Sequence, residues 1–449
     1  ALLPTWGGFI DSFVPRAVRG ARLRDHVPVT AAYLGHILTL THVGRVGWPE
    51  WKDMRVLDLD PELLVGTARN FRDRDGKRLP QHPERQNYPY VRFTADEYPV
   101  MIEAGINLFI VDDVQERSVR DQPVFYYRDP TLPGAPLDYP GDLYRSNYLG
   151  NTMFMDEPAC IMLGDEHVQR LFRHVTDGTA LITARVEARF HSEGHYGAYA
   201  IERAFRSLGV SFGNMTLVAP DYPAWETIFE TSQYQMAGGV AGVVHEGRYQ
   251  LDEFTRNANA TSGLPREYTA EEMLRYIYAF LRGAARHYNK DWGTSIYGQA
   301  DPAISPLALR LAYDMGARYL WFWTSDHDHH LPWPEQLELA RVIRDHARAK
   351  PRGSIRGPKP MLDRAIVLPY GELLTVESPD RRAAYDLWWV REIDAARTNE
   401  AGRRYAALAR RAFAEIHKAM DAGEDFDILY DDGRPIEGYR HITRIEAPN

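Results

Sequence analysis

The sequence contains very little cysteine: Cys160 is the single one in 449 residues. An intrachain disulfide is therefore excluded, although the compartment stays open because many exported bacterial enzymes also lack disulfides. No run of about 18 uninterrupted apolar residues occurs, so we expect no membrane-spanning helix and no membrane partner. Dense basic runs are missing as well and the net charge is -9, so we expect no nucleic-acid partner.

Several cofactor and nucleophile motifs are also missing. The chain has no Gly-x-Gly-x-x-Gly, no P-loop and no Gly-x-Ser-x-Gly, so nucleotide-binding and serine-hydrolase functions have no motif behind them. We expect no cofactor. The chain begins at Ala1 without a methionine or a hydrophobic leader. We expect a secreted or periplasmic bacterial protein whose signal peptide is absent from this chain, with a trimmed chain as the alternative.

Aromatic residues are abundant, with 26 tyrosines and 10 tryptophans. Such side chains add hydrophobic mass to a large core, and their flat faces also stack on sugar rings. Either use accounts for any one of them, so position along the chain must decide.

Apolar β-prone runs alternate with helix-like segments, which is typical of a parallel sheet. In the C-terminal half, for example, Ser305-Pro306 opens a helix and Gly316 ends it. We expect an α/β fold, a (β/α)₈ TIM barrel, with long insertions near 35–95, 129–150, 160–210 and 248–265. The eight expected strands are 27–34, 106–111, 124–128, 151–155, 214–219, 240–244, 293–298 and 318–323.

A proline-, glycine- and arginine-rich segment, PRGSIRGPKP, divides the sequence. We therefore predict a catalytic barrel over 1–350, a linker over 351–360 and a small α/β accessory domain over 361–449. The accessory domain would support the barrel or mediate homo-oligomerisation.

Acids, histidines and aromatics follow the expected strands. In a barrel of this type the chemistry lies at the carboxyl ends of the strands. Cleavage of a glycosidic bond needs one carboxylic acid to protonate the leaving oxygen and a second carboxylate to attack the sugar or activate water. The residues at these ends are Asp112, Asp113, Asp156, Glu157, Asp221, His245, Glu246, Arg248, Tyr297, Gln299, Asp301, Trp321, Trp323 and the cluster at 326–330.

The end of the expected fourth strand reads MDEPA. It resembles the Asn-Glu-Pro signature of clan A (β/α)₈ glycoside hydrolases, and the resemblance covers about residues 25–350. It implies that Glu157 is the general acid/base and that Trp323 is the aromatic residue at the end of strand eight. Asp156 stands where the family has an asparagine that contacts the sugar.

The sequence departs from the family at the expected seventh strand, which ends in IYGQAD with Gln299 where the family has its nucleophilic glutamate. The best substitute is Glu246, because it ends a strand and Arg248 nearby favours its ionised form. Asp301 is the second choice. The separation of the two carboxylates decides between retention and inversion, so both outcomes stay open.

The predicted function is hydrolysis of a β-linked oligo- or polysaccharide by Glu157 and Glu246, without a metal. Two alternatives are a non-catalytic carbohydrate-binding barrel and a metal-dependent hydrolase or isomerase built on the Asp/His cluster at 326–330. The side chains expected to bind the carbohydrate are Asp156, His245, Arg248, Tyr297, Gln299, Asp301, Trp323, Asp326 and His327.

Overall fold

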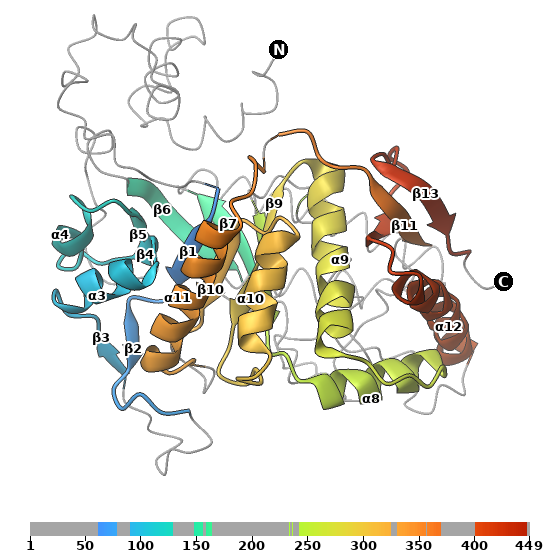
Figure 1. Ribbon diagram of the computed structural model, residues 1–449, viewed down its shortest axis with the longest axis horizontal. Coiled ribbons are helices and arrows are strands. Elements are labelled where there is room, and N and C mark those ends of the chain that lie inside the picture. The colour runs from blue at the N-terminus through green and yellow to red at the C-terminus, as the bar shows by residue number, and fades with distance from the viewer. Residues whose placement is uncertain are drawn as a thin grey trace, which may run out of the picture. The chain divides into compact units, whose positions relative to one another are not determined.

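A computed structural model describes residues 62–78, 90–128, 148–155, 159–163, 233, 236, 242–324, 330–355, 357–369 and 400–446. Within these ranges the chain is a mixed α/β protein in which most strands pair in parallel (Figure 1). Among the helices so described, none is both long and apolar enough to cross a membrane. The chain divides into two compact units, and four elements (β6, β7, β10 and α11) have residues in both.

The first unit contains parallel strands with short helices between them. β1 pairs with β4, β4 with β5 and β5 with β6, all in parallel. Gly105 adopts a left-handed conformation (φ 114°) and ends α3, as its sequence position predicts. The elements are β1 (Leu64–Thr67), β2 (Phe71–Asp73), β3 (Tyr90–Arg92), α3 (Glu97–Ala104), β4 (Leu108–Ile110), α4 (Glu116–Val119), β5 (Phe125–Arg128), β6 (Tyr148–Met155), β10 (Tyr319–Phe322) and α11 (Trp333–Ala349).

The second unit is built around a parallel pair of strands, β8 and β9, which are buried along their whole length. Helices α9 and α10 pack on β9. Strand β7 pairs with β8 in the antiparallel sense, which departs from the all-parallel strands expected of a (β/α)₈ barrel. The elements are β7 (Ala159–Leu163), β8 (Gly242–Gly247), α8 (Leu251–Ser262), α9 (Ala270–Tyr288), β9 (Asp291–Ile296), α10 (Ser305–Asp314), β11 (Leu362–Pro369), α12 (Glu400–Asp421), β12 (Phe426–Asp431) and β13 (Tyr439–Arg444).

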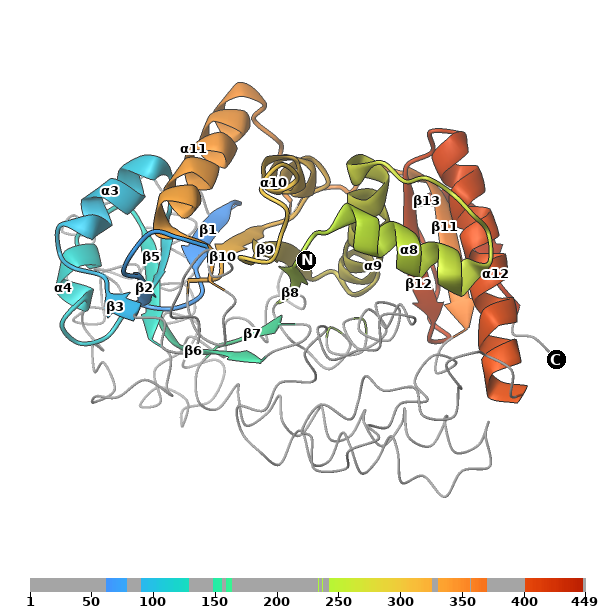
Figure 2. The same cartoon turned by 90° about the horizontal axis from the view of Figure 1, so that it is seen from below.

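A second sheet in this unit has the order β12-β11-β13, with all its pairs parallel. It lies between two helices, with α9 against β12 and α12 against β11 (Figure 2). α9 begins with a capping box formed by Thr269 and Glu272, and its middle is buried on every side. One helix therefore serves two sheets: one face covers β9 and the other covers β12.

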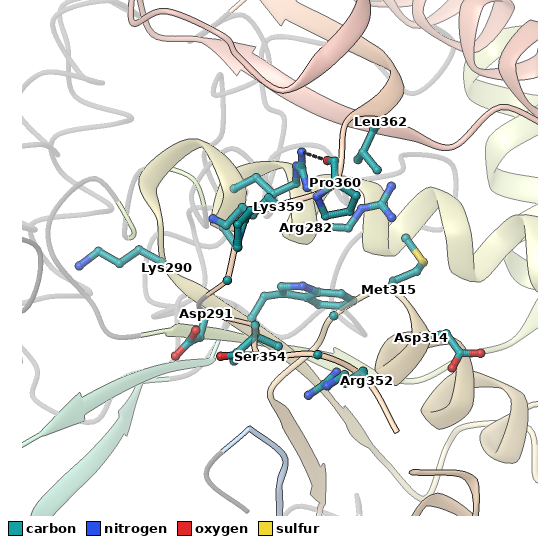
Figure 3. Close-up of a pocket in the computed structure, with 18 of the residues that line it drawn as sticks. Arg282, Lys290, Asp291, Asp314, Met315, Arg352, Ser354, Lys359, Pro360 and Leu362 are labelled. Atoms are coloured by element: carbon teal, nitrogen blue, oxygen red, sulfur yellow. Dashed lines mark hydrogen bonds between the residues drawn. The ribbon is translucent and has the colours of Figure 1, made fainter. Parts of the chain in front are cut away.

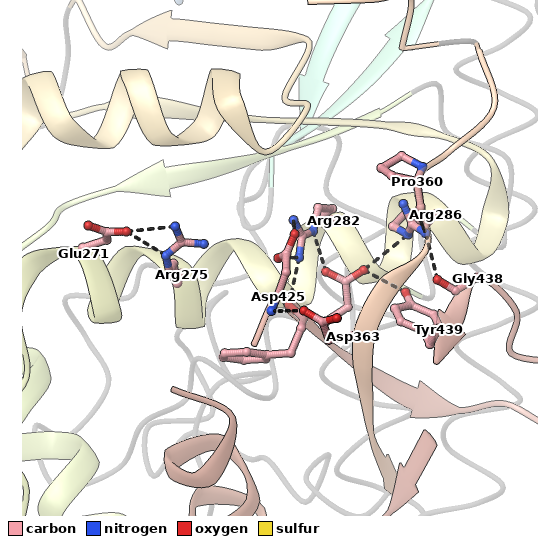
Figure 4. Close-up of polar contacts among 11 residues, drawn as sticks. Glu271, Arg275, Arg282, Arg286, Pro360, Asp363, Asp425, Gly438 and Tyr439 are labelled. Atoms are coloured by element: carbon pink, nitrogen blue, oxygen red, sulfur yellow. Dashed lines mark hydrogen bonds and ion pairs between the residues drawn. The ribbon is translucent and has the colours of Figure 1, made fainter. Parts of the chain in front are cut away.

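Buried ion pairs fasten α9 to this sheet (Figure 4). Arg282 Nε donates to Asp427 Oδ1 over 2.6 Å, and Arg282 Nη2 donates to Asp425 Oδ1 over 2.6 Å. Tyr439 donates its hydroxyl to the second oxygen of Asp427 over 2.7 Å. Arg286 donates to the carbonyl oxygens of Pro360 and Gly438. The fully buried Asp427 carboxylate thus binds groups from α9 and β13.

Most of the described helices and strands agree with the predictions made from the sequence, but two predicted insertions contain strands. The region 35–95 was expected to be an insertion, yet it contains β1, which pairs with β4. The region 160–210 was also expected to be an insertion, yet its first residues belong to β7. β1 is four residues long and β7 is five residues long, and each is too short for a distinct periodic pattern. The expected strands at 27–34 and 214–219 lie outside the described residues.

Other predicted elements are confirmed. Strands were expected at 106–111, 124–128, 151–155 and 318–323, where β4, β5, β6 and β10 occur. α10 begins at Ser305, and Gly316 follows its end with a φ of 95°. In the C-terminal region the expected strand, long helix and two further strands are all present. The division at 351–360 stays a prediction.

The close approach of β9 to Tyr319 predicts that Gly293 cannot carry a side chain. A Cβ at this position would lie 2.0 Å from the Tyr319 carbonyl oxygen. We expect Gly293→Ala to lower the free energy of unfolding by about 1–3 kcal/mol or more, measured by urea denaturation. Gly353→Ala is the control, because a Cβ there has no neighbour within 4 Å. If Gly293→Ala and Gly353→Ala were equally stable, the close contact between Gly293 and Tyr319 would be contradicted.

The ion pairs of α9 predict a large cost for removing Arg282. Arg282→Met leaves Asp427 buried with less compensation, so we expect a loss of about 3 kcal/mol in the free energy of unfolding. The control is Arg275→Met on the same helix, where the side chain is 38% exposed and pairs with Glu271. We expect that loss to stay below about 1 kcal/mol. A similar loss in both variants would show that the buried pairs do not hold the sheet.

Candidate active site at the end of β8

Glu246 is the second-to-last residue of β8, and its side chain is buried. The expected strand at 240–244 extends instead to Gly247, so His245 and Glu246 belong to the strand and do not follow it. In the parallel ladder His245 lies opposite Thr294, and Glu246 lies opposite Ser295. These positions lie at the carboxyl end of a parallel pair, where functional groups gather in α/β folds.

Gly247 permits the tight turn that follows Glu246. The Arg248 amide donates to the Glu246 carbonyl over 3.0 Å, which closes a three-residue turn. A Cβ on Gly247 would lie 2.1 Å from the Ser295 carbonyl oxygen. A larger residue therefore cannot occupy this turn without moving β9.

Glu246, Arg248 and Tyr297 form one polar cluster. Arg248 Nη2 lies 2.7 Å from Glu246 Oε2, and the two side chains are only 7% and 4% exposed. The Arg248 guanidinium carbon lies 4.2 Å from the centre of the Tyr297 ring, within range of a cation–π interaction. The Arg248 guanidinium thus contacts both the Glu246 carboxylate and the Tyr297 ring.

His245 belongs to the opposite face of β8, because successive side chains of a strand point to opposite sides. Its ring lies 5.9 Å from the Tyr249 ring. The Tyr249 hydroxyl is hydrogen-bonded to Thr294 Oγ1, and the Tyr278 hydroxyl lies 3.0 Å from it. Since Tyr278 comes from α9, this face looks toward the helix. The structure therefore does not bring His245 and Glu246 to one surface.

Burial favours the neutral forms of the side chains on the face of β8 that is directed toward α9. The pKa of His245 falls from about 6.5 to about 3 because burial disfavours the charged imidazole, an effect that Glu246 opposes and Arg248 reinforces. Burial also raises the pKa of Tyr249 and of Tyr278. All three side chains are therefore neutral at neutral pH.

Two other predicted residues follow β9, which ends at Ile296, two residues before the expected end. Gln299 is half-buried, and its carbonyl oxygen accepts a hydrogen bond from Gln250 Nε2 over 2.9 Å. Asp301 is exposed, and its Oδ1 accepts from the Ala303 amide over 2.8 Å. Asp301 thus serves the turn that leads into α10.

The tryptophans of the expected eighth strand lie in the first unit. Trp323 is 7% exposed, and the Arg69 guanidinium carbon lies 5.6 Å from its ring centre. Trp321 packs closely on Gly66, where a Cβ would lie 2.8 Å from the indole nitrogen. Both are packed side chains in this unit.

Asp156, Glu157, Asp326 and His327 lie outside the described residues. His330, the last member of the 326–330 cluster, is buried, with Nε2 2.8 Å from the Lys77 carbonyl and Nδ1 3.2 Å from the Tyr90 hydroxyl. Both ring nitrogens are therefore engaged within the protein. In the described part of the chain, no group of three or more His, Cys, Asp or Glu side chains is placed to hold a metal ion.

Comparison with protein-family models, curated protein sequences and solved structures gives no significant match. The resemblance to clan A glycoside hydrolases therefore stays a prediction that rests on the chain's own residues.

The sequence analysis did not predict the hydrogen-bonded hydroxyl groups of Tyr249, Tyr278 and Thr294. A signal was present, since Thr294 interrupts a buried strand with a polar side chain, which requires a hydrogen-bond partner. The partner could not be identified without the register of β8 and β9.

The lowered pKa of His245 predicts a pH dependence of stability. With a folded pKa of about 3 and an unfolded pKa of about 6.5, only the unfolded state binds a proton between these values. Stability from the neutral ring is complete above about pH 6.5 and falls toward pH 3, by at most about 1.4 kcal/mol per pH unit. We expect His245→Gln to flatten the urea-denaturation profile in this window. His441→Gln, at an exposed site, should not, and equal profiles for both would contradict the burial effect.

Proposed function

We propose that the protein is a glycoside hydrolase on a (β/α)₈-like barrel in which β7 runs antiparallel to β8, with Glu157 as general acid/base and Glu246 as the second carboxylate. The substrate would be a β-linked oligo- or polysaccharide outside the cytoplasm. Cleavage requires two carboxyl groups about 5–10 Å apart on either side of the glycosidic bond.

Chain geometry is the observation that carries the proposal. Ala159 pairs with Val244 in the antiparallel ladder of β7 and β8. Glu157 precedes Ala159 by two residues, and Glu246 follows Val244 by two. Because β7 and β8 are antiparallel, the chain before Ala159 and the chain after Val244 lead toward the same end of the pair. Two residues of extended chain span at most about 7 Å. The described pairing thus places Ala159 beside β8, two residues along that strand from Glu246, which supports the choice of Glu246 as the partner of Glu157.

The surroundings of Glu246 support its role. Its pairing with Arg248 over 2.7 Å favours the ionised form, which is the form that a nucleophile or a base for water needs. Tyr297 stacks under the same arginine. We assign the protonated role to Glu157 because MDEPA resembles the Asn-Glu-Pro signature, in which the glutamate is the general acid/base.

The ion pair of Glu246 and Arg248 is also compatible with a second candidate function, which is binding of carbohydrate without cleavage. Glu246 and Arg248 are 4% and 7% exposed, as in a structural ion pair, and Gln299 replaces the glutamate of the clan A pattern. In that case sugar would bind but would not be hydrolysed.

Hydrolysis of a panel of oligo- and polysaccharides by wild type, Glu157→Gln and Glu246→Gln tests the proposal. Removal of either carboxylate should lower kcat/KM by about 10³-fold or more, because each takes part in bond cleavage. The control is Glu253→Gln, an intermediate-exposure glutamate on α8, which should keep full activity. Denaturation profiles confirm folding of each variant.

Activity that survives Glu157→Gln would contradict the proposal. Loss with Glu157→Gln alone would move the second role from Glu246 to Asp301. Sugar binding without turnover in the wild type would favour the second candidate.

A further inference from the structure

The turn after β8 sends two neighbouring side chains to opposite faces of the strand. Arg248 pairs with Glu246 on one face. Tyr249 turns back to the other face, where its ring lies 5.9 Å from the His245 ring. Gly247 leaves space for this reversal, because a Cβ there would lie 2.5 Å from Cε2 of Tyr249. Tyr249 therefore lies behind the turn that carries Glu246 and Arg248.

The Tyr249 hydroxyl is anchored by a buried chain of hydroxyl groups. It is hydrogen-bonded to Thr294 Oγ1 of β9. The Tyr278 hydroxyl of α9 lies 3.0 Å from it and 3.0 Å from the Ala308 carbonyl oxygen of α10. Tyr249, Tyr278 and Thr294 are at most 2% exposed, so these hydrogen bonds lie in surroundings of low polarity that strengthen them. One side chain of the turn is thus tied to β9, α9 and α10.

Backbone hydrogen bonds join the same turn to the segment that follows β9. The Tyr297 amide donates to the Gly247 carbonyl over 3.1 Å. The Asp301 amide donates to the Tyr249 carbonyl over 2.8 Å. The Tyr249 backbone therefore links the chain segments that follow β8 and β9.

We propose that Tyr249 is a positioning residue, which holds the turn so that Glu246 and Arg248 keep their places at the end of β8. It acts from the opposite face of the strand and takes no direct part in bond cleavage. The effect on hydrolysis rests on the proposed function, whereas the anchoring of the turn does not. Because a displacement of about 1 Å in a reacting group can cost on the order of 10²-fold in rate, loss of the anchor should lower kcat.

Tyr249→Phe tests the anchor, because it removes the hydroxyl and keeps the ring under Gly247. We expect amide hydrogen exchange in the segments 247–250 and 297–301 to become about tenfold faster or more, since their hydrogen bonds would open locally more often. Exchange is measured by mass spectrometry on the full chain. The segment 312–317, at the end of α10, should exchange as in the wild type.

Tyr313→Phe is the matched control. Tyr313 is also buried, and its hydroxyl donates to the Lys350 carbonyl over 3.0 Å and accepts from the Arg352 amide over 3.3 Å. It precedes Asp314, which lines a cavity of about 410 Å³ at the start of β9 (Figure 3). The variant loses a buried hydroxyl as Tyr249→Phe does, but the turn after β8 should exchange as in the wild type.

Thr294 supplies an independent test of the same anchor. Thr294→Val removes the hydroxyl that bonds to Tyr249 and should repeat the effect of Tyr249→Phe, whereas Thr294→Ser retains a hydroxyl and should exchange as in the wild type. On a substrate that the wild type hydrolyses, Tyr249→Phe and Thr294→Val should each lower kcat about tenfold and change KM less than about twofold.

Unchanged exchange in the turn after Tyr249→Phe would overturn the proposal. Equal acceleration in Tyr313→Phe would overturn it too, because the effect would then be one of global stability. A raised KM with kcat retained would also contradict a positioning role. If the wild type hydrolyses no substrate, the proposed function fails, and the exchange measurements alone decide whether Tyr249 anchors the turn.

Discussion

The buried pair of Arg282 and Asp427 is the interaction on which the second unit depends. It joins α9 to β12 where a charge would otherwise stand inside the protein without compensation. The same helix approaches β12 so closely that a Cβ on Gly283 would lie 2.8 Å from the Ile428 carbonyl. Because α9 also covers β9, the ion pair fixes the helix layer behind the candidate active site.

Successive side chains of β8 point to opposite faces, so the neighbours His245 and Glu246 lie in different surroundings. His245 faces the helix layer, where burial keeps it neutral beside Tyr249 and Thr294. Glu246 faces away from that layer and pairs with Arg248. One residue of displacement thus separates a packed imidazole from a carboxylate that pairs with an arginine. This division explains why adjacent polar residues in a sequence need not share a site.

Long, regular elements were predictable from the sequence, and short ones were not. α12 has a sustained amphipathic pattern, and α10 carries Ser305-Pro306 at its start. β1 and β7 are only four and five residues long, and the antiparallel direction of β7 has no local signature. For the site, Glu246 and Arg248 could be selected from strand position, but the separation of His245 from them required the exact strand limits.

The separation of the Glu157 and Glu246 carboxyl groups tests the central claim most directly. A crystal structure of the full chain, refined well enough to place both side chains, supplies it. The account predicts a distance of about 5–10 Å across an open cleft, which the two-carboxylate mechanism requires. Carboxyl groups more than about 12 Å apart, or on opposite faces of the strands, could not flank one glycosidic bond and would contradict the proposed function.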